Sequence, residues 1–158
     1  MPADTTIRLS PIREGSVDRQ SLFSLYKTSL HDCIAQTFGW DESYQQARFD
    51  TQYGDDALSL IWRGAEIAGC LALRNETPSL HVSLLLLWPT YRGEGIGREV
   101  MQMVMSQATS AGMPVTLSCF LSNQAALKFY EALNFSVTST DEHFVNLRSA
   151  ELAGRVRR

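Results

Sequence analysis

The chain has 158 residues, of which 44% are hydrophobic and 20% charged, and its formal net charge is −3. This length suits one domain, residues 1–158, and the composition is that of a globular protein rather than a disordered chain. The weak negative charge argues against a general nucleic-acid surface.

The three cysteines are odd in number and far apart, which argues against a disulfide framework and a Cys-x-x-Cys site. The first ten residues, MPADTTIRLS, lack a basic segment followed by an apolar core. No run reaches the roughly 18 apolar residues of a membrane span. We therefore expect a cytoplasmic protein with reduced thiols, no targeting segment and no membrane anchor.

The first third of the chain predicts one strand and two helices. Residues 5–13 alternate loosely between apolar and polar, as in a strand. Apolar residues at helical spacing predict a helix over residues 16–34, with Ser16 as its N-cap. Asp41 is placed to cap a second helix that runs to about residue 50, although its apolar face is weak.

Three strands are predicted next. Residues 57–62 and 66–73 are strand-like runs joined at Arg63-Gly64-Ala65, which indicates a hairpin. A further strand over residues 80–88 contains four consecutive leucines at positions 84–87. A run without polar alternation is typical of a strand covered on both faces. We therefore expect this strand to be central in the sheet.

The rest of the chain predicts two helices and three strands. The helices cover residues 95–111, ended by Gly112 and Pro114, and residues 123–133; the strands cover 115–119, 135–140 and 143–148. The full order is β-α-α-β-β-β-α-β-α-β-β, which combines strand–helix–strand units with hairpins. The predicted fold class is α/β or α+β, with one mixed sheet.

Three glycines, Gly93, Gly95 and Gly97, lie between a buried strand and a helix. Unpaired N–H groups and the helix dipole favour an anion there, most often phosphate, and missing Cβ atoms let it approach the backbone. The pattern is neither G-x-G-x-x-G, which would need glycine at Arg98, nor G-x-x-x-x-G-K-[ST], which would need a lysine. Neither NAD nor ATP is indicated.

Two motifs point to one family. Arg92-x-x-Gly95-x-Gly97, after a strand ending in Trp88-Pro89, resembles the acetyl-CoA loop of the GNAT N-acetyltransferase superfamily. The segment NQAALKFYEALNF, residues 123–135, is similar to the family's N-x-x-A-x-x-F-Y-E-x-x-G-F. It departs at Asn134, where the family has glycine, but asparagine tolerates the left-handed conformation best after glycine. The stretch FGWDESYQQARF also resembles the second helix of many small members.

The resemblance implies a mostly antiparallel mixed sheet of about seven strands flanked by helices, with a splayed cofactor cleft, and acetyl-CoA as the cofactor. Backbone groups of Leu85, Leu86 and Leu87 would pair with the pantetheine arm. Asn123 would also reach the cofactor. The pyrophosphate would be held by backbone amides of Arg92, Gly93, Glu94, Gly95, Ile96, Gly97 and Arg98.

Acetyl transfer to an amine needs a base for the amine proton and an acid for the leaving thiolate. By resemblance Tyr130 would face the sulfur of the cofactor, and it is our candidate acid. His81 is the candidate base, because its usual pKa is about 6.5, while water relayed through backbone groups is the alternative. Cys119 has no histidine or acid beside it in sequence. We therefore expect direct transfer of the acetyl group to the amine rather than a covalent acetyl-enzyme intermediate. His31 and His143 lack the partners of a metal site.

The expected acceptor is a primary amine of a small molecule or a peptide, bound against the first two helices and the last hairpin. Acidic residues there could attract an ammonium group, but they are also usual helix caps and dipole partners: Asp32, Asp41, Glu42 and Glu142. Relatives often dimerise, so a homodimer through the last hairpin stays open. The alternatives are a non-catalytic acyl-CoA binding or sensing module of the same fold, and an interaction protein whose glycines form only a tight turn.

Overall fold

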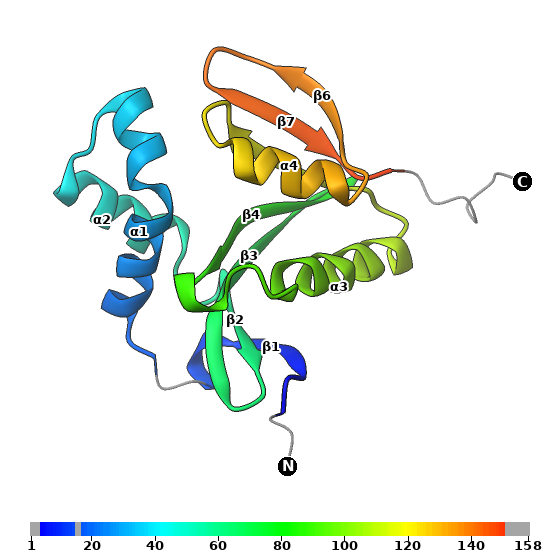
Figure 1. Cartoon of the computed structure of the whole chain (residues 1–158), viewed down its shortest axis with the longest axis horizontal. Coiled ribbons are helices and arrows are strands. Elements are labelled where there is room, and N and C mark those ends of the chain that lie inside the picture. Colours follow the sequence, from blue (N-terminus) through cyan, green and yellow to red (C-terminus); the bar gives the residue numbers. More distant parts are fainter. Residues whose placement is uncertain (1–3, 15–16, 151–158) are drawn as a thin grey trace, which may run out of the picture. The chain divides into compact units, whose positions relative to one another are not determined.

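The structure, a computed structural model, describes residues 4–14 and 17–150 (Figure 1). The predicted order of helices and strands is confirmed, with a short 3-10 turn after the first strand and another before the third helix. The elements are β1 (Ile7–Pro11), η1 (Ile12–Glu14), α1 (Arg19–Phe38), α2 (Glu42–Gln52), β2 (Leu58–Arg63), β3 (Glu66–Glu76), β4 (Ser79–Leu87), η2 (Pro89–Tyr91), α3 (Ile96–Ser110), β5 (Val115–Phe120), α4 (Gln124–Ala132), β6 (Ser136–Thr140) and β7 (Phe144–Arg148).

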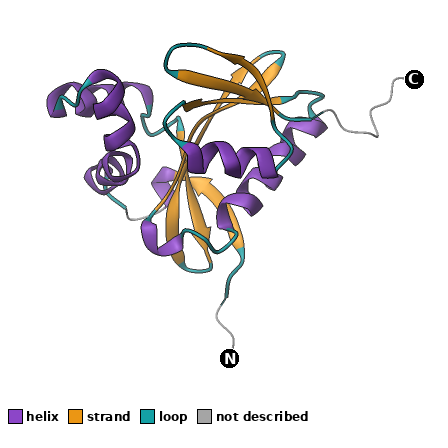
Figure 2. Cartoon of the chain, turned by 45° about the horizontal axis from the view of Figure 1, so that its top comes forward, coloured by secondary structure: helices purple, strands orange, loops and turns teal. Residues whose placement is uncertain are grey.

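The strands, orange in Figure 2, form one mixed sheet. It has seven strands, in the order β1-β2-β3-β4-β5-β7-β6. The pairs β1–β2, β2–β3, β5–β7 and β6–β7 are antiparallel. β4 and β5 are parallel, as expected where a helix, here α3, makes the crossover between two strands. The predicted fold class, a mostly antiparallel mixed sheet with flanking helices, is confirmed.

By its contacts the chain divides into two compact units. Unit 1 comprises Met1–Leu73 and Leu84–Val100, and unit 2 comprises Arg74–Ser83 and Met101–Arg158. The elements β3, β4 and α3 run from one unit into the other. That residues 1–158 act as one domain stays a prediction.

An aromatic cluster joins α1 to α2 in unit 1. The ring centroids of Phe23, Tyr26 and Phe49 lie 5.2 to 6.0 Å apart. The Tyr26 hydroxyl donates to Oε1 of Gln45 over 2.9 Å, which satisfies a buried amide. One fully buried ring, Phe49, and this hydrogen bond therefore hold a helix whose apolar face is otherwise weak.

The two N-terminal helices begin at aspartate caps. The carboxylate of Asp41 accepts from the Tyr44 N–H over 2.9 Å, as predicted. The prediction of Ser16 as the first cap is wrong, because Asp18 accepts from the Ser21 N–H over 2.8 Å and α1 begins after it. Ser16 itself lies outside the described residues. A carboxylate at this position also interacts favourably with the positive end of the helix dipole.

β4 lies between β3 and β5, so its central position is confirmed. Its burial alternates, however, which corrects the prediction that both of its faces are covered. Leucine on both faces conceals this alternation in the sequence. The buried face carries Leu80, Val82, Leu84 and Leu86, and the half-buried face carries His81, Ser83, Leu85 and Leu87.

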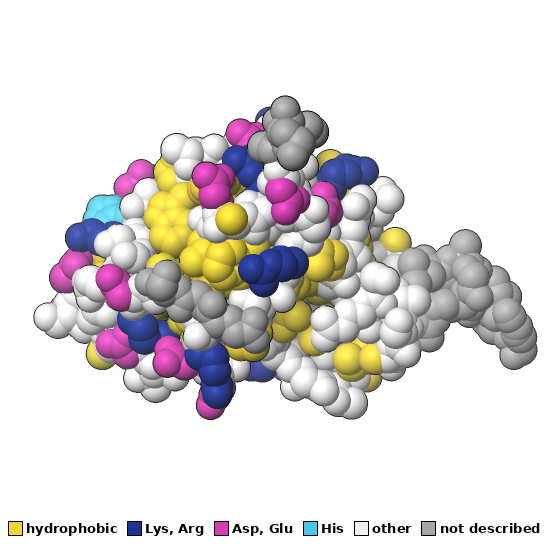
Figure 3. Space-filling model, turned by 90° about the horizontal axis from the view of Figure 1, so that it is seen from below, with side chains coloured by type: hydrophobic (Ala, Val, Ile, Leu, Met, Phe, Trp, Pro, Cys, Tyr) yellow, Lys and Arg dark blue, Asp and Glu magenta, His cyan; other side chains and the backbone are white. Residues whose placement is uncertain are grey.

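The surface carries both signs of charge. In the view of Figure 3, basic and acidic side chains are interspersed among hydrophobic ones. Among the helices of the described residues, none has the length and apolar character needed to cross a membrane.

Candidate functional site

The loop between β4 and α3, in unit 1, contains two glycines with positive φ angles. Gly93 and Gly95 have φ angles of 76° and 83°, a left-handed conformation that costs other residues roughly 1–2 kcal/mol. A Cβ atom added to either would meet no atom within 4 Å. The glycines are therefore needed for the backbone conformation, and the space beside them is open to a ligand.

The loop also presents unpaired donors. In the described part of the chain, the backbone N–H groups of residues 93–98 donate to no acceptor. They belong to the loop and to the first turn of α3, where helix geometry leaves N–H groups without partners. Arg92 differs, because its N–H donates to the Pro89 carbonyl over 3.2 Å. Together with the positive end of the α3 dipole, these donors suit an anion.

The side chain of Arg92 ties the loop to two other elements. Its Nε donates to the carbonyl oxygen of Leu87 over 3.0 Å, and a terminal nitrogen donates to Ser29 Oγ on α1 over 3.1 Å. One backbone acceptor predicted for the pantetheine arm is thus already engaged, although a carbonyl has a second lone pair. The Trp88 N–H donates to Ala68 on β3 over 3.0 Å, which fixes the end of β4.

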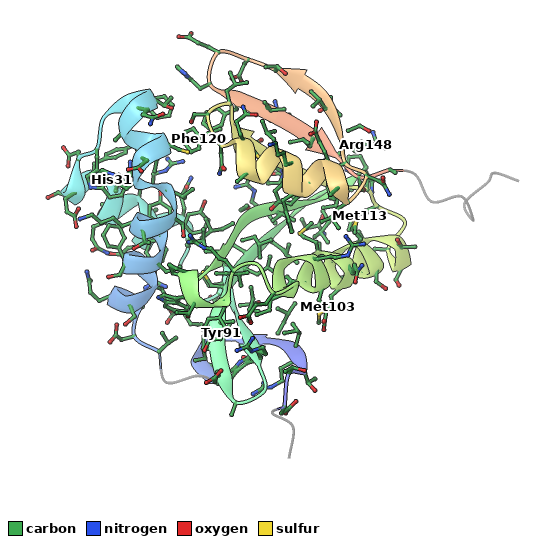
Figure 4. All side chains as sticks on the ribbon, viewed as in Figure 1. His31, Tyr91, Met103, Met113, Phe120 and Arg148 are labelled. Carbon is green, nitrogen blue, oxygen red and sulfur yellow. The ribbon has the colours of Figure 1, made fainter. Side chains whose placement is uncertain are left out.

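Three side chains link the loop to the β2–β3 hairpin. Tyr91, labelled in Figure 4, donates from its hydroxyl to Oε1 of Glu66 over 3.2 Å. Arg63 forms an ion pair with Glu94, and its Cζ lies 4.9 Å from the centre of the Tyr91 ring. The loop is therefore anchored at Tyr91 and Glu94 as well as at Arg92.

In unit 2, Asn123 and Tyr130 occupy the two ends of α4. Oδ1 of Asn123 accepts from the Ala126 N–H over 3.1 Å, so Asn123 is the N-cap and its side-chain NH₂ is left for a ligand. The Tyr130 ring is 8% exposed and packs edge-on against Phe129 and Phe135, at 4.9 and 5.6 Å. Both side chains are held by local contacts.

The environment of Tyr130 keeps its hydroxyl protonated. Burial raises the pKa of Tyr130 above its usual value, and Cys119 adds to the rise. Among the described residues the hydroxyl has no hydrogen-bond partner, so it can donate to a ligand. Burial also raises the pKa of Cys119 to about 11, so Cys119 is a thiol at neutral pH and a poor nucleophile.

His81 lies on the half-buried face of β4, in unit 2. Its Nδ1 is 2.9 Å from Oγ1 of Thr116 on β5 and 3.8 Å from a carboxylate oxygen of Glu76. Burial lowers the pKa of His81 below its usual value; the Glu76 carboxylate opposes this shift, and Arg74 adds to it. His81 is therefore neutral at pH 7 and able to accept a proton.

The face of β5 that carries Thr116 also carries Ser118, and it ends in Phe120, which packs on Phe144 of β7. Ser118 donates to Oδ1 of Asn146, its partner on β7, and Asn146 donates to Ser139 on β6 over 2.9 Å. Residues of the other face, among them Val115 and Leu117, are buried. Unit 2 thus has hydroxyl and amide groups on the sheet face that begins at His81.

The acidic residues proposed to attract an amine each have a local partner. Asp41 caps α2, Glu42 accepts from Lys27 and Trp40, and Asp32 and Glu142 lie 3.1 and 3.8 Å from the neighbouring histidines. These pairings fit helix capping and surface ion pairs. Within the described ranges, no cluster of three His, Cys, Asp or Glu side chains could hold a metal.

The sequence did not point to Arg63 or Thr116. Thr116 could have been found by pairing the strand at 80–88 with the one at 115–119, since the register sets His81 opposite Thr116. No sequence pattern indicated a role for Arg63, because its partner Glu94 is 31 residues away.

The described chain thus has a mixed sheet, a glycine loop at the N-terminus of α3 and a buried tyrosine on α4. Residues 20–135 match the family described as the Acetyltransferase (GNAT) family, so the chain belongs to that family. It is an acyltransferase that uses acetyl-CoA, as the sequence predicted. No curated protein sequence matches the chain.

Solved structures share the fold at low sequence identity. The PaiA N-acetyltransferase of Thermoplasma acidophilum, solved in complex with coenzyme A, is 16% identical with a TM-score of 0.72, and the match covers 92% of this chain and 99% of that one. An N-acetyltransferase from Staphylococcus aureus Mu50 is 14% identical, with a TM-score of 0.68 and coverages of 89% and 99%. An acetyltransferase from Streptococcus agalactiae 2603 is 15% identical, with a TM-score of 0.69 and coverages of 92% and 98%.

Proposed function

We propose that the chain transfers the acetyl group of acetyl-CoA directly to a primary amine of a small molecule or peptide. The observation that carries this proposal is the set of unengaged amides at residues 93–98, beside two glycines with open space. Acetyl-CoA supplies the activated thioester. The similar T. acidophilum structure was solved with coenzyme A, which supports the same ligand for this loop.

The proposed cofactor contacts are mostly backbone groups. The amides of Gly93, Glu94, Gly95, Ile96, Gly97 and Arg98 would bind the pyrophosphate, with Arg92 fixing the loop. The NH₂ group of Asn123 would donate to the cofactor. Leu85, Leu86 and Leu87 would pair with the pantetheine arm, beyond the ladder that joins residues 80–82 to residues 115–117.

The proposed transfer replaces the C–S bond of the thioester with a C–N bond to the amine. The amine nitrogen bonds to the acetyl carbon as the C–S bond breaks, and the amine loses a proton while the sulfur gains one. The Tyr130 hydroxyl would be the donor, which its protonated state and its lack of a hydrogen-bond partner among the described residues support. Its raised pKa exceeds the roughly 8.5 of a thiol, so the proton transfer is uphill and would have to accompany C–S cleavage, after which the phenolate would regain a proton from solvent and the base would release the amine proton to solvent.

His81 would take the amine proton. The role requires the tautomer in which Nδ1–H donates to Oγ1 of Thr116, because Nε2 is then free to accept. The polar face that begins at His81 supports an acceptor bound beside it. Water relayed through backbone groups remains the alternative base, and it predicts that His81→Gln retains most of the activity.

The first test is ligand-dependent stability. With CoA or acetyl-CoA at about 100 times its dissociation constant, the free energy of unfolding should rise by about 2.7 kcal/mol. No shift at millimolar ligand would contradict the assignment of the loop. A shift should be followed by panels of amines assayed for release of the CoA thiol. Binding without thiol release on any amine would favour a non-catalytic acyl-CoA module.

Two further points belong to this proposal. We place the activity in the cytoplasm, because Cys33, Cys70 and Cys119 are free cysteines. Homodimerisation through the last hairpin is consistent with β6, an edge strand of the sheet whose five residues are all exposed. The mass of the protein in solution, measured by light scattering, tests the dimer.

A further inference from the structure

Glu94 is an unexpected residue in a loop for anions. It stands between Gly93 and Gly95, next to the amides that we propose hold the pyrophosphate of CoA. Its side chain is 46% exposed, so it is not hidden from the loop surface. A carboxylate there would repel a bound pyrophosphate, which is itself negatively charged.

Arg63 supplies the opposite charge from a different element. Its guanidinium pairs with Oε1 of Glu94, and a second nitrogen lies 3.6 Å from Oε1 of Glu66. The side chain is 26% exposed and stacks near the Tyr91 ring. The backbone of Arg63 is fixed on both sides, opposite Ile7 of β1 and Glu66 of β3. The positive charge is therefore held in place beside the loop.

We propose that Arg63 is a positioning residue for the cofactor loop, which neutralises Glu94 so that the loop accepts the pyrophosphate. The proposal rests on the proposed function of the loop. The Arg63–Glu94 pair carries no net charge, and removal of Arg63 leaves one negative charge next to the free amides.

Removal of the Arg63 side chain should act on CoA binding mainly through electrostatics, because other contacts also hold the loop. The Tyr91 hydroxyl bonds to Glu66, the Arg92 side chain bonds to the Leu87 carbonyl, and the Trp88 N–H bonds to Ala68. None of these bonds involves the carboxylate of Glu94. A chain without the Arg63–Glu94 pair therefore retains three fixed points around the loop.

The experiment compares the CoA dissociation constants of the wild type, Arg63→Gln, Glu94→Gln and the double variant by calorimetry at low salt. The affinity for CoA should fall when the Arg63–Glu94 pair becomes more negative and rise when it becomes more positive. Arg63→Gln should weaken binding about tenfold, equivalent to about 1.4 kcal/mol, and Glu94→Gln should tighten it. The double variant should recover most of the loss. At about 1 M salt the loss should shrink, because the screening length falls to about 3 Å.

A truncated donor and a remote arginine serve as controls. S-acetylpantetheine lacks the pyrophosphate, so Arg63→Gln should leave its turnover unchanged while raising KM for acetyl-CoA with little change in kcat. Arg13→Gln removes an exposed ion pair with Asp56 in the same unit and should leave CoA affinity unchanged. The free energy of unfolding without ligand shows whether each variant is folded.

The outcomes separate this proposal from the function on which it rests. A wild-type protein that does not bind CoA overturns both. If the wild type binds, equal affinity of Arg63→Gln overturns this proposal alone, as does a double variant as weak as Arg63→Gln. Should Arg63→Gln fail to fold, Glu94→Gln decides, since weaker binding than wild type contradicts the proposal.

Discussion

The backbone N–H of Phe135 donates to the carbonyl oxygen of Tyr130 over 3.0 Å, and the two rings lie 5.6 Å apart. Asn134 has a φ of 69°, and its N–H donates to the Glu131 carbonyl over 3.0 Å. These two hydrogen bonds around a left-handed residue form a Schellman motif, with its usual hydrophobic contact. The end of α4 therefore fixes both the backbone and the ring of Tyr130.

Substitutions of Asn134 should separate backbone conformation from side-chain chemistry. Asn134→Gly should retain or slightly raise stability, because glycine adopts a positive φ freely. Asn134→Val should lose about 1–2 kcal/mol or more, because a branched side chain is strained there. Urea unfolding measures both. Equal stability of the two variants would contradict a role for the left-handed conformation.

Removal of the Tyr130 hydroxyl should slow the reaction while preserving the packing of the ring. Tyr130→Phe should lower kcat by roughly 10²–10⁴-fold, the usual contribution of a general acid. Full turnover at every pH would exclude the acid role. Tyr26→Phe is the matched control, because it removes a buried hydroxyl from unit 1, where Gln45 is the acceptor, and should affect stability rather than kcat.

Local features of the fold could be predicted because their causes lie within a few residues. The left-handed Asn134 follows from its place after a helix, and the cap at Asp41 from its place before one. The Arg63–Glu94 pair spans 31 residues and could not be predicted from such patterns. The His81–Thr116 contact spans 35 residues and requires, in addition, the pairing and register of β4 and β5.

The alternating burial of β4 could not be predicted from the sequence for a different reason. Periodicity reports burial only when the two faces carry different residue types, and positions 84–87 are all leucine. The half-buried state of Leu85 and Leu87 is therefore not visible in the sequence. In contrast, the site was indicated by motifs, because glycines at fixed spacing express a backbone requirement.

Gly69 should be intolerant of any side chain. A Cβ atom there would collide with the Leu86 carbonyl oxygen and lie 2.9 Å from Cα of Leu87, so the backbone of β4 would have to move. Gly69→Ala should lose about 1–3 kcal/mol of stability or more. Gly54→Ala is the control, because its nearest neighbour is 3.9 Å away. Equal unfolding free energies of these two variants would contradict the close approach.

His81 should make stability depend on pH. Burial lowers its pKa in the folded state, so as the pH falls below about 6.5 the unfolded chain binds a proton before the folded chain does. The contribution of His81 to the free energy of unfolding is present above about pH 6.5 and is lost as the pH falls through the lowered pKa. His81→Gln should flatten this part of the profile, measured by urea unfolding from about pH 5 to 7.5. Parallel profiles of wild type and His81→Gln would contradict the shift.

Gly95 and Gly39 allow the loop's function to be separated from backbone strain. Both have a positive φ, of 83° and 81°, and neither has an atom within 4 Å of an added Cβ. Alanine at either position should therefore be strained, at a cost on the order of 1–3 kcal/mol of stability.

Only Gly95 lies among the free amides of the loop, whereas Gly39 ends α1 and donates to the Ala35 carbonyl over 3.1 Å. Gly95→Ala should raise the CoA dissociation constant about tenfold or more, because the added methyl occupies the space beside the amides, and Gly39→Ala should leave it unchanged. Calorimetric titration with CoA measures both. A loss of affinity that follows stability equally in the two variants would show that strain, and not access to the loop amides, governs binding.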